Sequence, residues 1–227
     1  MPSNLFDLSE QYDAMLDQGI RLSGEDKTFF LKARIRDLKH HLPPAFKSRR
    51  ILDFGCGIGD TAHHLAEAFP EAEIIGVDSA SAAIEKAKNR FTSPHLSFHD
   101  FASLALEQPF DLCYAHGVFH HIEPAKRSEA LDLIYHSLAR GGWFALSENN
   151  PWNPGTRLVM SKIPFDRDAV PINFLEAKRL IRQAGFSRLG LTRFLFYFPR
   201  ALAFLRFLEP PLAALPLGAQ YYVLAQK

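Results

Sequence analysis

The sequence predicts an α/β sandwich built on a mostly parallel sheet. Short apolar runs alternate with segments whose apolar residues recur at helical spacing, a pattern typical of strand–helix–strand units. The first unit, residues 51–69, joins a strand, a glycine turn and a helix. With 227 residues, 47% of them apolar and 22% charged, the chain is long enough for one domain with modest additions.

Residues 1–44 are expected to form a helical cap in front of the main fold. Residues 5–22 are amphipathic, and a second helix follows for which Ser23 is the expected N-cap. The apolar stripe of that helix consists of Leu31, Ile35, Leu38 and Leu42. Pro43 and Pro44 end the helix.

The stretch from Ile51 to Thr61 organises the predicted fold. Its strand, Ile51–Phe54, stops at a turn with almost no side-chain bulk, so a ligand can lie against bare backbone. The turn carries Gly55, Gly57 and Gly59. The following helix directs its N-terminus at this turn, which predicts a nucleotide-type site at the carboxyl end of the strand.

The glycine spacing indicates which nucleotide. The pattern Asp53-x-Gly55-x-Gly57-x-Gly59 differs from the dinucleotide fingerprint G-x-G-x-x-G. A carboxylate at Asp53 would repel a pyrophosphate but suits a cationic amino group. With these residues in view, the chain resembles the class I S-adenosylmethionine (SAM) dependent methyltransferases, whose first motif is [Asp/Glu]-x-Gly-x-Gly-x-Gly.

The resemblance covers about residues 45–227, and it is closest in kind to bacterial small-molecule members of the ubiquinone and menaquinone type. It implies a Rossmann-like sandwich with helices on both faces. The implied sheet has seven strands in the order 3-2-1-4-5-7-6, and its last two strands, around residues 188–196 and 221–226, pair antiparallel. The implied cofactor is SAM, and the implied product is S-adenosylhomocysteine.

The next two strands also end in acids. Glu73–Asp78 ends about 20 residues after the turn, where nucleotide folds place a carboxylate that accepts hydrogen bonds from ribose hydroxyls. The third strand, Leu96–His99, runs into Asp100 and Phe101. The resemblance implies that Asp100 accepts from the adenine amino group and that Phe101 lies beside the ring.

The fourth strand, Phe110–Ala115, runs into His116, His120 and His121. Some relatives of the resembled family hold a divalent ion here with Glu-x-x-Glu-His. This chain has Gly117-x-x-His120-His121 and lacks both acids, so we expect no metal. His120 or His116 is the better candidate for a general base, since an imidazole titrates near neutrality, and His121 matches a structural histidine.

The fifth strand, Trp143–Ser147, leads into Glu148, which either serves as a base, orients a histidine or ties down a loop. Asn173 opens a later helix with a capping-box pattern. The segment from 197 to 218 is strongly apolar but is broken by four prolines, which argues against a membrane-spanning helix. We interpret it as short helices buried against the core or a dimer partner. The alternative is a lid or membrane-leaning flap for a lipophilic acceptor.

These residues define the expected site. The cofactor-binding candidates are Asp53, Gly55, Cys56, Gly57, Gly59, Thr61, Asp78, Ser79, Asp100, Phe101 and His116, with Tyr12 and Arg34 from the N-terminal helices. The catalytic candidates are His120, His116 and Glu148. The expected reaction is in-line transfer of the SAM methyl group to an oxygen, nitrogen or carbon of a small organic acceptor, with lipophilic compounds among the candidates.

Charge and composition narrow the alternatives. A net charge of +1 offers no broad cationic field for nucleic acid, which disfavours an RNA or protein methyltransferase with a basic groove. Two cysteines, Cys56 and Cys113, suggest a reducing compartment, so we expect a cytoplasmic location. A SAM-binding protein that does not methylate stays open, while a dinucleotide oxidoreductase is disfavoured by Asp53. Homodimerisation also stays open.

Overall fold

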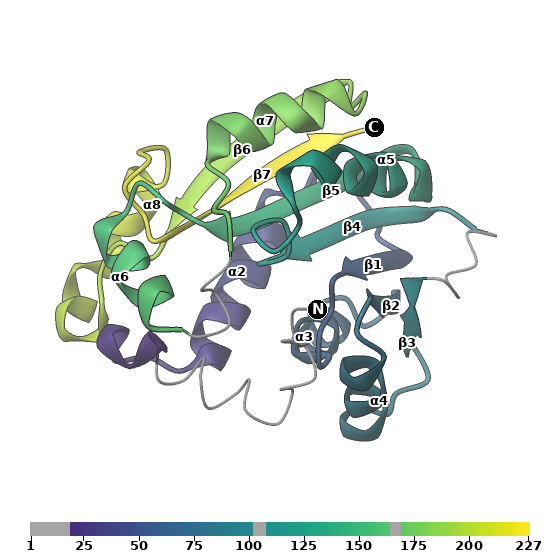
Figure 1. The fold of residues 1–227 in the computed structure, drawn as a ribbon, viewed down its shortest axis with the longest axis horizontal. Coiled ribbons are helices and arrows are strands. Elements are labelled where there is room, and N and C mark those ends of the chain that lie inside the picture. The colour runs from purple at the N-terminus through teal and green to yellow at the C-terminus, as the bar shows by residue number, and fades with distance from the viewer. Residues whose placement is uncertain (1–18, 102–107, 164–168) are drawn as a thin grey trace.

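The computed structural model describes residues 19–101, 108–163 and 169–227. Its centre is one seven-stranded sheet of order β3-β2-β1-β4-β5-β7-β6, the order that the resemblance predicts (Figure 1). The strands are β1 (Arg50–Phe54), β2 (Glu73–Asp78), β3 (Leu96–Asp100), β4 (Phe110–His116), β5 (Leu138–Asn149), β6 (Arg188–Leu195) and β7 (Gln220–Gln226). Only β7 runs antiparallel to its neighbours, β5 and β6.

Helices cover both faces of the sheet, as predicted (Figure 1). They are η2 (Arg21–Ser23), α2 (Lys27–His41), α3 (Asp60–Ala68), α4 (Ser81–Arg90), η4 (Pro124–Lys126), α5 (Arg127–Ser137), α6 (Pro154–Lys162), α7 (Phe174–Gln183), η6 (Arg200–Leu208) and α8 (Glu209–Leu212). Successive strand residues face opposite sides, so Ile51 packs with α2, α3 and α4 while Leu52 packs with α5 and α7. The fold class is therefore confirmed.

Helix α2 buries its predicted apolar stripe, but its N-cap is Asp26 and not Ser23. The Asp26 carboxylate accepts a hydrogen bond from the Phe29 amide at 2.7 Å. Gly24, in the left-handed conformation with φ 75°, separates η2 from α2 and leaves Ser23 outside the helix. On α2, Asp37 accepts two hydrogen bonds of 2.9 Å from Arg193 of β6, which fixes the helix to the sheet.

Two later elements differ from the prediction. Strand β5 begins at Leu138, because the chain returns to pair with β4 before the glycines at 141 and 142. Helix α6 follows β5 and was not among the predicted elements; Asn153 caps it by accepting from the Thr156 amide at 2.9 Å. Its first helical residue is Pro154, which suits this position because the first helical amide has no partner in any case.

The apolar segment after β6 forms η6 and α8. The prediction that this segment is buried against the core is wrong for η6, because none of the residues of η6 is buried. Phe204 and Phe207 are 72% and 73% exposed. In the ranges that the structure describes, no helix is long and apolar enough to cross a membrane.

Candidate functional site

The carboxyl ends of the parallel strands open into a cavity of about 1060 Å³. Phe54, Asp78 and His116, the last residues of β1, β2 and β4, all line it. Its other walls include residues of α2, α5 and α6, the loop after β4, and residues 196–199.

The glycine turn presents bare backbone to this cavity. The amides of Gly55 and Cys56 donate to the Val77 carbonyl at 2.8 and 2.9 Å, which fixes the turn against β2. Gly55 and Gly57 have φ of 75° and 53°, which favour glycine. A Cβ on Gly55 would lie 2.4 Å from Val118, whereas a Cβ on Gly57 would meet nothing within 4 Å. The cavity therefore reaches the backbone at Gly57.

Asp78 is held at the edge of the cavity by backbone amides. Its carboxylate accepts from Gly57 and Ala80, both at 2.9 Å. Burial raises the pKa of Asp78, although the hydrogen bonds from these amides oppose the rise. Since a carboxylate has about four acceptor positions, it can still accept from a ligand.

Most of the expected cofactor residues meet at this place. Those that line the cavity are Gly55, Cys56, Gly57, Thr61, Asp78, Ser79, Phe101, His116 and Arg34. Gly59 does not line it: its Cβ would lie 2.8 Å from the Phe98 ring, so this glycine allows close packing of strand and helix. Asp100 also lies off the lining and accepts from the Ser81 hydroxyl at 3.0 Å. Tyr12 lies outside the described residues.

Asp53 lies behind the turn. It is 1% exposed, is not among the lining residues, and its Oδ2 atom has no hydrogen-bond partner. Burial first, and the negative charge of Asp78 second, raise the pKa of Asp53 to about 8. A cation on the cavity side of the turn would favour the ionised form of this carboxyl group.

His120 and Glu148 form a buried pair. The His120 Nδ1 lies 2.6 Å from Glu148 Oε2, and the two side chains are 4% and 1% exposed. The other oxygen of Glu148 accepts from the Phe119 amide at 2.7 Å. His120 lines the cavity and Glu148 does not, so the carboxylate fixes the ring orientation from behind.

His116 lies beside this pair in a cationic setting. Its Nδ1 lies 3.1 Å from the Ser147 hydroxyl. Burial first, then the positive charge of Arg34 and the neighbouring His120 ring, hold the pKa of His116 well below its usual range. Arg34 is itself buried and donates to the side chain of Gln220 at 2.9 Å. His116 is therefore neutral at pH 7 and can only be a weak base.

Arg127 supports the histidine loop, residues 116–122, which carries the three histidines; the sequence did not reveal this role. It is 1% exposed, and its Nε donates to the carbonyls of Phe119 and Ile122 at 3.1 and 3.2 Å. It also donates to the Val170 carbonyl and pairs with Glu176 at 3.0 Å. No local pattern reveals it, because its partners lie on three separate segments.

The cavity wall formed by α2, α6 and residues 196–198 is apolar, and the sequence did not predict it. Its apolar residues include Phe29, Phe30 and Leu31 of α2, Val159 and Met160 of α6, and Ile163, Phe196 and Phe198. The Phe196 ring packs edge-on against Phe30, with 4.8 Å between centroids. Phe196 also has φ 64°, a left-handed conformation that is energetically unfavourable for a bulky side chain. Such strained residues are common in ligand-binding sites.

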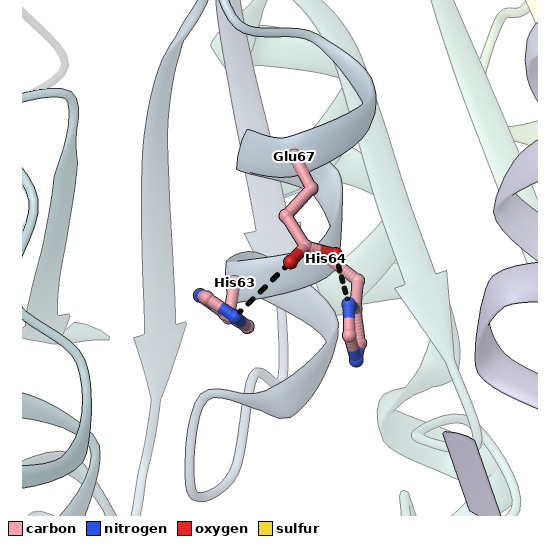
Figure 2. Close-up of side chains that lie close together, drawn as sticks. All are labelled: His63, His64 and Glu67. Carbon is pink, nitrogen blue, oxygen red and sulfur yellow. Dashed lines mark hydrogen bonds and ion pairs between the residues drawn. The ribbon is translucent and has the colours of Figure 1, made fainter.

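A separate cluster on α3 has ligand atoms close enough to hold a metal ion. Figure 2 shows Glu67 between His63 and His64, with Nδ1 of His64 at 2.7 Å and Nε2 of His63 at 3.6 Å. None of the three lines the cavity. The hydrogen bond from His64 first, among other contacts, lowers the pKa of the Glu67 carboxyl group. Two ordinary helical ion pairs explain this surface cluster.

Comparisons with known proteins agree with the fold. Residues 52–144 match the family described as "Methyltransferase domain". A trans-aconitate 2-methyltransferase of Methylobacterium nodulans is 32% identical over 124 residues, which are 54% of this chain and 47% of that protein. A malonyl-[acyl-carrier protein] O-methyltransferase of Bacillus anthracis is 31% identical over 43% of this chain and 36% of its own length.

Among solved structures, a SAM-dependent methyltransferase of Thermotoga maritima, titled a possible histamine N-methyltransferase, has a TM-score of 0.69 at 18% identity. The alignment covers 99% of this chain and 100% of that one. The sequence match to trans-aconitate 2-methyltransferases spans about half of their length.

Residues 52–144 are therefore similar to methyltransferase domains, and the chain shares its fold with solved SAM-dependent methyltransferases. The matched domain covers the glycine turn, Asp78 and the histidine loop. The two curated relatives described above are named for trans-aconitate and a malonyl carrier protein, so they give no support to the narrower likeness to ubiquinone-type enzymes.

Proposed function

We propose that the protein transfers the methyl group of SAM to a small, largely apolar acceptor. The observation that carries this proposal is the position of Gly57 and Asp78 on the same cavity as the His120–Glu148 pair. Bound SAM supplies an electrophilic methyl group on a sulfonium. The protein then has to align the acceptor, exclude water and remove a proton where the acceptor carries one.

The residues at the turn fit this cofactor. The open backbone at Gly57 leaves room for a ligand that a side chain would exclude. We assign Asp78 to the ribose hydroxyls and Phe101 to the adenine face, and Asp100 to the adenine amino group as the resemblance implies. Arg34 is buried at the other side of the cavity, where we assign it to the cofactor carboxylate. Asp53 then acts through its charge from behind the turn.

On the acceptor side we assign His120 as the general base and Glu148 as the residue that orients it. A carboxylate at 2.6 Å holds the proton on Nδ1, which directs the basic nitrogen of the ring toward a substrate proton. His116 is a weaker candidate because its pKa is depressed. We expect no metal for this reaction.

The names of the curated relatives favour a second acceptor, a polycarboxylate such as trans-aconitate. Such a substrate needs unpaired cations, but Lys27 pairs with Asp60 at 3.2 Å and Arg206 pairs with Glu25 at 2.9 Å. These pairs and the apolar wall favour the apolar acceptor. An RNA or protein substrate and SAM binding without methyl transfer remain alternatives, and we keep the cytoplasm as the expected location.

The first test is calorimetric titration of SAM and S-adenosylhomocysteine into the wild type and Asp78→Ala. We expect the substitution to weaken binding by roughly 1–3 kcal/mol, the loss expected for hydrogen bonds to a charged group. Glu85→Ala, an exposed carboxylate on α4, is the matched control and should bind like the wild type. No binding of either compound to the wild type would refute the proposal.

The acceptor is tested with SAM carrying a labelled methyl group. Lipophilic phenols and acids, trans-aconitate, total RNA and bulk protein are offered separately. We expect label in the lipophilic pool. Label in trans-aconitate, RNA or protein would replace our acceptor with that one, and binding without any turnover would favour the non-methylating alternative.

A further inference from the structure

Large apolar side chains gather on the outside of the segment from 202 to 217. Of the twelve exposed large apolar residues in the described chain, six lie here. They are Leu202, Phe204, Phe207, Leu208, Leu215 and Leu217. This concentration is unusual for a surface that faces only water, where exposed apolar residues are normally scattered.

The polar groups of the same segment point inward. Glu209 accepts from the amides of Tyr197 and Phe198, both at 3.1 Å. The Arg206 guanidinium lies over the Phe29 ring at 4.6 Å and donates to the Phe198 carbonyl at 3.2 Å. The segment is therefore fixed by its polar side and presents its apolar side outward, the reverse of an ordinary surface helix.

The segment also forms part of the cavity wall. Residues 196–199 and Arg206 line the cavity, and η6 follows them directly. Leu158 of α6, another lining residue, is 51% exposed. An apolar compound on the outer face of η6 thus lies close to the cavity mouth.

We propose that this face, residues 202–217 with Arg200 beside it, docks the protein on an anionic lipid bilayer, from which the apolar acceptor enters the cavity. The proposal deepens the proposed function, because it states where the acceptor comes from. Exposed aromatic side chains bordered by arginine suit the interface of a membrane with negatively charged headgroups.

The charges favour a bilayer over a second copy of the chain. Arg200 is exposed at the start of η6, where its guanidinium donates to the Gly24 carbonyl at 3.4 Å, while Glu209, the acid of the segment, is turned inward. A two-fold contact would bring the same patch of both copies together, and Glu209 is already engaged by backbone amides and does not face a second copy's Arg200. An anionic surface instead complements Arg200.

The test is co-sedimentation of the full chain with vesicles, either of phosphatidylcholine or of phosphatidylcholine and phosphatidylglycerol in equal parts. We expect binding to the anionic vesicles and a loss of about tenfold or more in Phe204→Ser/Phe207→Ser. Arg200→Gln should lose about fivefold on anionic vesicles alone. Leu175→Ser, which removes a side chain 54% exposed on α7, is the matched control and should bind like the wild type.

Absence of wild-type binding to vesicles, or equal binding by the double variant, would overturn the proposal. Sedimentation velocity without vesicles provides another test, since self-association that the double variant abolishes would assign the face to a second copy. SAM calorimetry on the same proteins separates the two proposals. Vesicle binding in a protein that fails to bind SAM would leave the docking face standing and refute the methyltransferase assignment.

Discussion

The two sides of the cavity are built in different ways. Apart from Arg34, the side that we assign to the cofactor comes from one stretch, residues 54–101, and is fixed by hydrogen bonds such as that from the Gly57 amide to Asp78. The side that we assign to the acceptor combines α2, the histidine loop, α6 and residues 196–220. A site for an invariant ligand can be encoded locally, whereas a site for a variable ligand is assembled from distant segments.

The largest effect is expected at the point where the two sides meet. His120→Gln and Glu148→Gln should each lower turnover by about 10²- to 10⁴-fold, the range for loss of a general base, with SAM affinity unchanged. Turnover should recover at high pH, where the acceptor loses its proton without help. His121→Gln, at another lining residue, is the control, and an equal loss there would contradict the assignment.

Alanine substitutions at two glycines of the same turn should affect different properties: protein stability at Gly55 and SAM affinity at Gly57. Gly55→Ala places a Cβ 2.4 Å from Val118 at φ 75°, so we expect the free energy of unfolding to fall by about 2–4 kcal/mol. Gly57→Ala meets no protein atom within 4 Å and should cost only about 1 kcal/mol of stability. SAM affinity should nevertheless fall, because the new methyl group enters the cavity.

Denaturant unfolding and SAM calorimetry on both glycine variants measure these effects. If Gly57→Ala bound SAM as tightly as the wild type, the cofactor would have to lie elsewhere in the cavity. If Gly55→Ala were as stable as the wild type, the turn would be free to move away from Val118.

Phe196→Asn tests whether the acceptor side can be altered without an effect on the cofactor side. Asparagine tolerates φ 64° better than phenylalanine but removes the ring that packs on Phe30. We expect KM for an apolar acceptor to rise roughly fivefold to tenfold, the value of an aromatic contact, with SAM affinity unchanged. A change in SAM affinity alone would move Phe196 to the cofactor side.

The same contrast explains what the sequence could predict. Strand–turn–helix patterns are local, so the sheet, the glycine turn and Asp78 follow from the residues between 51 and 78. The N-cap at Asp26 was missed because Ser23 and Asp26 are both good caps, and only the left-handed Gly24 decides between them. Arg127 and Phe196 were missed because their roles depend on contacts with segments that no spacing rule connects.

The apolar segment of residues 197–218 shows a second reason why the sequence alone could not predict part of the structure. Its composition predicts burial, and hydrophobicity alone cannot tell a buried face from one that binds another surface. The exposure of Phe204 and Phe207 is set by Glu209 and Arg206, which hold the polar side of the segment against the protein.

The smallest effect expected is the pH dependence that Asp53 gives to the cofactor side. Its pKa of about 8 in the ligand-free protein means that it is mostly protonated at pH 7. A bound cation stabilises the ionised form and lowers this pKa, so binding releases a proton and SAM affinity should rise with pH until about pH 8. Calorimetry in buffers of different ionisation enthalpy detects the released proton, and Asp53→Asn should abolish the release.

Protein stability must change with the opposite sign. The pKa of Asp53 is raised from 3.8 to about 8 on folding, so the folded protein binds this proton more tightly than the unfolded chain. The free energy of unfolding should therefore fall as pH rises from about 4 to about 8, and Asp53→Asn should remove that part of the slope. A proton release that survives in Asp53→Asn would show that another group responds to the cofactor charge. The carboxyl group before the first glycine would then serve packing alone.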